Sequence, residues 1–216
     1  MGWLAKRRLR TGPTVAVPYK PDRTKLLAVV ALADPDAKLD GDDVLAADCR
    51  VHAPVEADPD LVGGELEKVW ACRVEAEGPL PLDFFDRYLA EGIAARLDGL
   101  VVCKGEVVDP ADEEQTWLVL LPVRPAAEQL AEFLGEGEAD DYGVVRFEEA
   151  VLVPIADPSP MGRTLMPYSA EPARVEVRDE GVALRLAEEF QGVVVDRWRF
   201  RVDANDEASL DRQREA

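Results

Sequence analysis

Hydrophobic and polar positions alternate between strand-like and helix-like patterns from about residue 65 to 154. The stretch 65–77 has the alternation of a strand, and apolar residues fall four apart over 82–97, which predicts an amphipathic helix. Gly99 follows at the position of a C-terminal cap. Three further strands are predicted at 100–108, 116–123 and 143–154, and a second helix begins at Pro125. The order β-α-β-β-α-β is that of a split βαβ, or ferredoxin-like, unit.

Prolines interrupt this periodicity over 156–172, which we interpret as a Pro-rich loop or linker. The stretch 173–202 is predicted to form a strand, a helix and another strand. A lone βαβ unit buries too little surface to be stable, so it is expected to pack on an α+β body over 26–155. The remaining segments are a basic N-terminal arm at 1–25, expected to be mobile, and a polar tail at 203–216.

A faint internal repeat appears when Gly99 is aligned with Gly192. Both glycines follow a predicted helix and precede a hydrophobic strand with a pair of valines. A true duplication would pair the terminal βαβ with an apolar strand over 25–33, whereas convergence would give the same junction without a common origin. We therefore expect an α+β protein with a mainly antiparallel sheet and one or two ferredoxin-like halves.

The formal net charge of −19 limits the partners of this chain. An acidic body repels nucleic acid backbones, so no nucleic acid is expected to bind it. The charge is uneven, because 1–25 carries seven basic side chains against Asp22 alone. A basic protein partner, mimicry of nucleic acid and a bias in composition each account for the acidity.

Several enzyme classes need residues or motifs that this sequence does not contain. His52 is the only histidine, so a site that needs two histidine ligands cannot form within one chain. The GxSxG, P-loop and GxGxxG motifs are absent, and we expect no cofactor. Cys49, Cys72 and Cys103 form no close pair, which predicts reduced thiols and a cytoplasmic location. No apolar run is long enough to cross a bilayer.

Two metal-binding patterns are incomplete. Cys49, His52, Cys72 and Cys103 are the residue types of a zinc site, but their spacing does not fit one, and we interpret Cys72 and Cys103 as buried strand residues. A nucleophilic pair of Cys49 and His52 lacks an orienting group. The acidic segment 34–43 lacks two ligands of a calcium loop, so we expect a solvated turn and no metal.

The strongest binding pattern is a set of arginines on the last two predicted strands. Strand alternation over 193–202 places Arg197, Arg199 and Arg201 on one face, and it likewise groups Arg174 with Arg178. If the strands are neighbours, five guanidinium groups converge, which is typical of anion or acidic-peptide binding. The alternative is an exposed face on which the arginines pair with glutamates.

A second binding candidate is the loop over 158–168. It contains Met161, Arg163 and Tyr168, which are residue types that contact protein partners. The alternative is a linker whose apolar residues cover the edge of a sheet.

These patterns favour a non-catalytic, cytoplasmic binding or regulatory protein that acts on a protein partner or an anionic ligand through an Arg-lined sheet face. One alternative is a small-molecule enzyme with scattered carboxylates and arginines, which would show paired acids in a deep pocket. The other is an acidic mimic of nucleic acid. The partner and the oligomeric state stay open.

Overall fold

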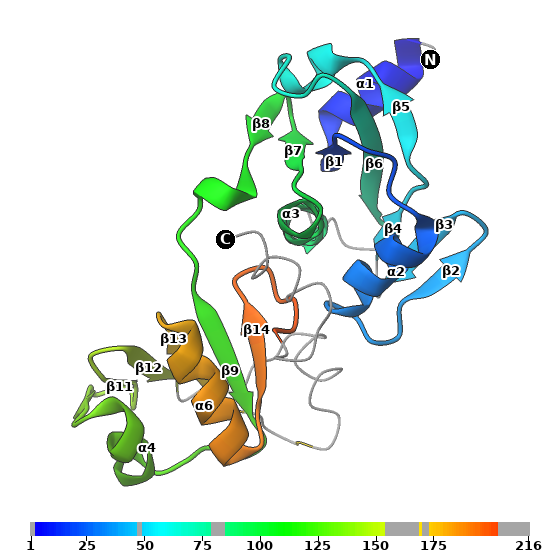
Figure 1. Cartoon of the computed structure of the whole chain (residues 1–216). Helices are drawn as coiled ribbons and strands as arrows, with labels where there is room; N and C mark the ends of the chain where they lie inside the picture. The colour runs from blue at the N-terminus through cyan, green and yellow to red at the C-terminus, as the bar shows by residue number, and fades with distance from the viewer. Residues whose placement is uncertain (1–2, 47–48, 79–84, 154–168, 170–172, 203–216) are drawn as a thin grey trace. The chain divides into compact units, whose positions relative to one another are not determined.

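The computed structural model describes residues 3–46, 49–78, 85–153, 169 and 173–202 (Figure 1). This part of the chain is mixed α+β, with two sheets in which every strand pair is antiparallel. The chain divides into two compact units between Glu113 and Glu114. In the described part, no helix is long and apolar enough to cross a membrane.

The described residues of the first unit form three α-helices, two short 3-10 helices and a sheet of eight strands in the order β2-β3-β4-β6-β1-β7-β8, with β5 also paired to β6. The helices are α1 (Trp3–Thr11), α2 (Arg23–Ala31) and α3 (Phe85–Arg96), with η1 (Pro59–Val62) and η2 (Pro110–Asp112). The strands are β1 (Thr14–Val17), β2 (Lys38–Asp40), β3 (Asp43–Ala46), β4 (Cys49–Val51), β5 (Val55–Ala57), β6 (Val69–Ala76), β7 (Leu100–Cys103) and β8 (Glu106–Val108).

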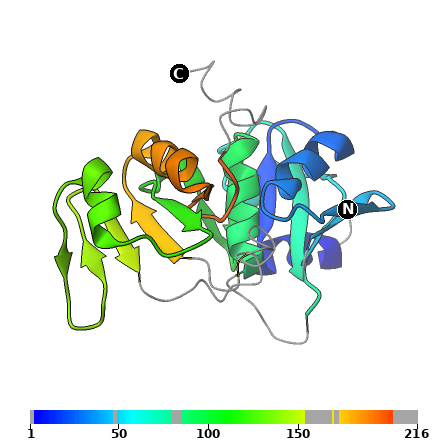
Figure 2. The same ribbon diagram turned by 90° about the horizontal axis from the view of Figure 1, so that it is seen from below.

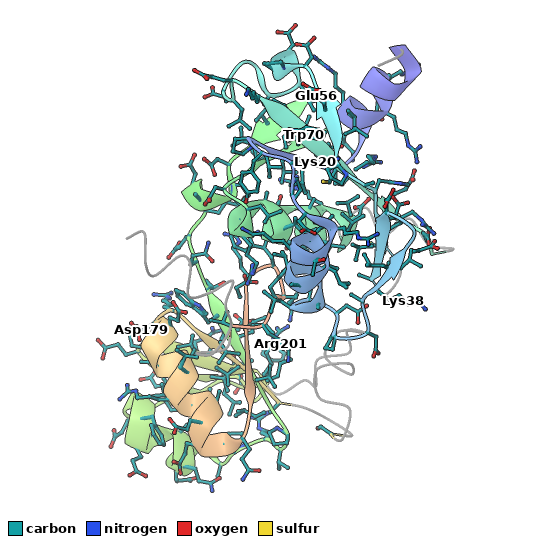
Figure 3. All side chains as sticks on the ribbon, turned by 45° about the vertical axis from the view of Figure 1, so that its right-hand side comes forward. Lys20, Lys38, Glu56, Trp70, Asp179 and Arg201 are labelled. Carbon is teal, nitrogen blue, oxygen red and sulfur yellow. The ribbon has the colours of Figure 1, made fainter. Side chains whose placement is uncertain are left out.

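The interior strand β1 of the first sheet is buried on both faces because helices cover the sheet. All four residues of β1 are buried. α3 packs on β1, β6 and β7, and α2 packs on β3 and α3. A second apolar cluster joins Leu9 of α1 and Leu61 of η1 to Ala16 and Ala71 of the sheet. The connection from β1 to α2 also contacts β6, because Lys20 lies over the ring of Trp70 at 5.2 Å from its centre (Figure 3).

In the described part of the second unit, two α-helices lie on one side of a six-stranded sheet in the order β10-β11-β12-β13-β9-β14 (Figure 2). The helices are α4 (Ala127–Leu134) and α6 (Glu180–Phe190). The strands are β9 (Trp117–Leu121), β10 (Glu138–Ala139), β11 (Val145–Arg146), β12 (Ala150–Val153), β13 (Ala173–Val177) and β14 (Val193–Asp196). Leu130 and Leu186 of the helices share one core with Val119 and Val175 of the sheet. Asp179 caps α6 by accepting a hydrogen bond from the Val182 N–H at 2.8 Å (Figure 3).

Both sheets contain four strands in the same relative order. In the first unit, β4, β6, β1 and β7 are neighbours in that order, and α2 and α3 follow β1 and β6 in the chain. In the second unit, β12, β13, β9 and β14 are neighbours in that order, and α4 and α6 follow β9 and β13. In each unit, the first strand therefore lies between the third and the fourth.

The two glycines aligned by sequence occupy equivalent places in these units. Gly99 follows α3 and precedes β7, and Gly192 follows α6 and precedes β14. The next residue pairs with the first strand in the same way, since Leu100 lies opposite Ala16 and Val193 lies opposite Leu120. A Cβ on Gly99 would lie 2.8 Å from the Ala16 carbonyl oxygen, and one on Gly192 would lie 2.6 Å from that of Leu120. Both junctions therefore need glycine.

Strand pairing differs from the prediction of one β-α-β-β-α-β unit over 65–154. β6, α3 and β7 belong to the first unit, whereas β9, α4 and β12 belong to the second. The stretch 100–108 is a hairpin of β7 and β8, because Lys104 and Gly105 turn the chain with positive φ angles of 53° and 85°. Hydrophobic alternation identifies a strand but not the sheet to which it belongs.

Two N-terminal predictions also differ from the structure. The stretch 1–25, expected to be a mobile arm, includes α1 and the buried central strand β1. The apolar run over 25–33, expected to be a strand, lies mostly in α2. Periodicity cannot separate a short buried strand from a buried helix. The cap decides here, because Asp22 accepts a hydrogen bond from the Thr24 N–H at 2.7 Å.

Candidate functional site

A polar face lies on β4 and β6 of the first sheet. Side chains alternate along β6, so Arg73 and Glu75 share the face that carries Ala71 of the apolar cluster. Arg50 on β4 lies opposite Glu75 in the strand register. The N–H of His52, just after β4, donates to the Arg73 carbonyl oxygen at 2.8 Å. Strand pairing thus brings two cations, a carboxylate and the histidine together.

His52 lies between two carboxylates. Its Nδ1 is 3.3 Å from Asp43 Oδ2, and its Nε2 is 2.9 Å from Glu75 Oε2. Glu75 also accepts a hydrogen bond from Arg8 of α1. Asp43 accepts one from the Ala53 N–H at 2.8 Å. The carboxylates therefore fix the imidazole ring at both nitrogens.

The same contacts keep both carboxylates charged. The hydrogen bond from His52 lowers the pKa of Glu75 despite its burial, and Arg8 adds to this effect. Burial alone would raise the pKa of Asp43, but the Ala53 N–H, Arg50 and His52 together lower it. Arg50 lies 3.2 Å from Asp43 and 2.9 Å from Asp40, and it also pairs with Glu77. Each acid of this network therefore has a cationic partner.

A pocket of about 370 Å³ adjoins this network. All of its lining residues belong to the first unit. They are Arg8, Leu9, Asp43, His52, Ala53, Val55, Ala71 and Arg73. The volume lies at the lower end of the range of small-ligand sites, and the mixture of apolar walls and a few polar groups is typical of them.

Arg73 is the cation in this pocket without an ion-pair partner among the described residues. Its Nη1 donates to the carbonyl oxygens of Pro13 and Val74, each at 2.7 Å. Its buried Nε has no acceptor in the described part. Burial lowers the pKa of the guanidinium although the charges of Glu75 and Asp86 oppose this change. A half-buried positive charge with neutral acceptors is a favourable place for an anion.

Gly12 leaves the space that this guanidinium occupies. A Cβ at Gly12 would overlap the terminal atoms of Arg73. The side chain therefore lies against the backbone that connects α1 to β1. This packing and the two carbonyl acceptors together hold Arg73 in place at the pocket wall.

The predicted arginine face of the second unit is divided. β9 lies between β13 and β14, so the strands that were expected to be neighbours are not. Arg174 on β13 pairs with Glu176 of the same strand at 3.1 Å, and not with a glutamate of a neighbouring strand. Arg178 follows β13 and is exposed.

The strand expected over 192–202 ends at Asp196. Asp196 Oδ1 accepts hydrogen bonds from the Trp198 and Phe200 N–H groups at 2.9 and 3.0 Å, which closes a turn. Arg197 and Arg199 lie in this turn, and Arg199 has a φ of 70°. Arg201 follows it, in a bridge to Val195 beside β14 (Figure 3). The three arginines therefore do not alternate along one strand.

Other sequence-predicted chemistry is not brought together. Met161, Arg163 and Tyr168 lie outside the described residues. Cys49 and His52 point to opposite faces of the sheet by strand alternation, so they do not form a nucleophilic pair.

The cysteines are buried within the sheet. Cys49, Cys72 and Cys103 form no disulfide in the described part of the chain. Burial raises the pKa of the Cys72 thiol to about 12. Within the described ranges, no group of three or more His, Cys, Asp or Glu side chains is placed to hold a metal ion.

Sequence analysis missed Arg8, Arg73 and Glu75 as members of a site. A local signal was present, because Arg73 and Glu75 alternate with apolar residues within the strand predicted over 65–77. Their contacts with His52 and α1 depend on strand and helix packing that no local pattern specifies. Comparison with family models, curated proteins and solved structures finds no match, so the geometry of this pocket is the basis for inferring a function.

Proposed function

We propose that this protein is a non-catalytic binding or regulatory protein that captures an anionic ligand in the pocket beside Arg73. The observation that carries the proposal is the positive charge of Arg73, which lines the pocket and has no carboxylate partner in the described part of the chain. An anion would supply that partner, and guanidinium groups bind carboxylates and phosphates through paired donors.

The state of His52 favours binding over catalysis. A general base needs a free nitrogen, but both ring nitrogens of His52 face carboxylates. A general acid–base pair of carboxyl groups needs pKa values that differ widely. Asp43 and Glu75 both have lowered pKa values, so both are charged at neutral pH. These features support a binding protein more than the alternative of an enzyme with scattered carboxylates.

The proposal keeps an Arg-lined sheet face as the binding surface but places it in the first unit. Arg174, Arg178, Arg197, Arg199 and Arg201 stay predicted as a second surface for an acidic partner. The contact of Arg174 with Glu176 and the turn at Asp196 make that surface the weaker candidate.

We also propose that each unit is a ferredoxin-like split βαβ unit and that the two form an internal repeat. The shared strand order supports this, as do the equivalent glycine junctions. The additional strands β2, β3, β5 and β8 in the first unit, and β10 and β11 in the second, would then be insertions or extensions.

The anion site is tested with the full chain and simple sodium salts. Acetate, benzoate, sulfate and phosphate are titrated at constant ionic strength, and binding is followed by amide chemical shifts in NMR. We expect shifts that saturate in the first unit with at least one anion, centred on β4 and β6. Arg73→Gln should abolish them, whereas Arg185→Gln on the exposed side of α6 should not. Saturable anion binding that persists in folded Arg73→Gln would contradict the proposal.

A further inference from the structure

One cation that lines the pocket is available to a ligand. Arg8 pairs with Glu75, and Arg50 is shared by Asp43, Asp40 and Glu77. Arg73 alone among the cations that line the pocket has no such partner in the described residues. A monoanion would balance this charge. A dianion would place a second negative charge near Asp43, which lines the same pocket.

The remaining wall of the pocket is apolar. It consists of Leu9, Ala53, Val55 and Ala71. Val55 is 43% exposed although it lies on a strand, so part of this wall faces water. A ligand with an apolar body would remove that surface from water and gain affinity beyond the contact of its charge.

One donor of Arg73 is open to a ligand. Nη1 donates to two carbonyl oxygens and Nε is enclosed, so Nη2 is the guanidinium nitrogen that a ligand can reach. Nη2 donates to no acceptor in the described residues, and a carboxylate oxygen can accept its hydrogen bond beside the positive charge. Phosphate monoesters carry close to two charges at neutral pH, so they fit the charge of the site less well.

From these three observations, we infer that the ligand is a small monocarboxylic acid with a compact apolar body. Its carboxylate pairs with Arg73, and its apolar part lies on Leu9, Val55 and Ala71. This inference rests on the proposed function and specifies the class of ligand. The volume of about 370 Å³ accommodates a small acid.

Four probes separate charge from apolar contact. Benzoate, acetate, benzyl alcohol and phenyl phosphate are titrated into the full chain by calorimetry at neutral pH. We expect benzoate to bind at least about tenfold more tightly than any of the other three. Acetate lacks the apolar body, benzyl alcohol lacks the charge, and phenyl phosphate carries too much of it.

Two variants test the two halves of the pocket independently. Arg73→Gln should weaken benzoate binding by at least about tenfold. Because Arg73 also holds two carbonyl oxygens, Val55→Asp provides a second test at a partly exposed position, where the new carboxylate repels benzoate. Val55→Thr keeps the shape of the side chain and should retain most of the affinity, as should Arg185→Gln. Circular dichroism confirms that each variant is folded.

The outcomes separate this inference from the proposed function. If acetate or phenyl phosphate binds as tightly as benzoate and Arg73→Gln abolishes binding, the anion site stands but the ligand class is wrong. If Val55→Asp leaves benzoate binding unchanged, the apolar wall is not used and the inference fails. If a tetrapeptide that ends in phenylalanine binds more tightly than benzoate, the ligand is the C-terminus of a peptide and the inference of a small acid is wrong. If no anion binds, both proposals fail.

Discussion

Gly99 and Gly192 each lie where a side chain would collide with the first strand of their own sheet. The obstacle is a backbone carbonyl oxygen in both cases, on Ala16 and on Leu120. Backbone cannot rotate away as a flexible side chain can, so a substitution must displace the strand that follows the glycine. Without a Cβ at these two positions, β7 can lie close to β1 and β14 can lie close to β9.

Alanine at either glycine should therefore destabilise the protein. We expect Gly99→Ala and Gly192→Ala to lower the free energy of unfolding by about 1–3 kcal/mol each, the usual cost of overpacking. Urea unfolding followed by circular dichroism measures the change. In Gly181→Ala on α6, the new Cβ would lie 3.2 Å from Asp179 Oδ1, and this control should change the same quantity by less than about 1 kcal/mol. Equal effects at all three positions would show that the carbonyl contacts are unimportant.

The network around His52 should make stability depend on pH. Because the folded-state pKa of Glu75 is lowered, the unfolded chain binds its proton first as the pH falls. This contribution to stability is fully present above the ordinary carboxyl pKa, and it is lost as the pH falls through the lowered one. Glu75→Gln should therefore destabilise the protein at pH 7, and the difference from the wild type should shrink between about pH 5 and pH 3.

Unfolding curves at a series of pH values measure that difference. Glu67→Gln, at an exposed position of the same unit, serves as the control and should follow the wild-type curve. A constant difference between Glu75→Gln and the wild type over the whole range would mean that ionisation of Glu75 does not stabilise the fold.

Asp196 determines where the element β14 ends. Its carboxylate offers the Trp198 and Phe200 N–H groups an acceptor, and the chain turns instead of continuing as a strand. Trp198 and Phe200 become buried in this way, at 2% and 0% exposure. A regular strand would have kept the arginines between them on one face. A side chain that hydrogen-bonds to backbone thus overrides the alternation of polar and apolar residues.

Removal of this carboxylate should destabilise the second unit. Asp196→Ala leaves two buried N–H groups without their acceptor, and we expect the free energy of unfolding to fall by about 2–4 kcal/mol. Near-ultraviolet circular dichroism of Trp198 and urea unfolding together detect the loss. Asp141→Ala, at an exposed position in the same unit, should have almost no effect. A stable Asp196→Ala protein would show that the buried aromatic residues form the turn without the carboxylate.

At the scale of the whole molecule, each unit has its own sheet and its own buried residues. Leu26 is fully buried in α2 of the first unit, and Leu130 is fully buried in α4 of the second. Cores that do not share residues can open separately, because the loss of one leaves the contacts of the other intact.

Core substitutions should therefore act within one unit. We expect Leu130→Ala to cost about 2–5 kcal/mol and to speed amide hydrogen exchange over 117–121 and 173–196, but not in β1 and β6. Leu26→Ala should show the reverse pattern. Mass spectrometry of exchange resolves both regions. Equal loss of protection in the two units, from either variant, would show that they unfold as one.

Local signals in the sequence determined most helices and many strands. The helix predicted over 82–97 corresponds to α3, and the first strand and the helix predicted within 173–202 correspond to β13 and α6. Gly99 was recognised from its position directly after a predicted helix, although the contact that requires glycine there, with the Ala16 carbonyl oxygen, is tertiary. Helix and strand signals depend on residues a few positions apart, so a linear pattern records them.

Only the tertiary structure shows which strands share a sheet and which residues meet in the candidate site. The sequence does not show that β6 and β9 belong to different sheets, or that His52 lies between Asp43 and Glu75. Arg73 has no direct ion pair in the described residues because strand and helix packing gives its guanidinium backbone carbonyl oxygens as acceptors. Pairing between distant strands depends on the total burial of a whole unit, and that energy is not carried by any short segment of the chain.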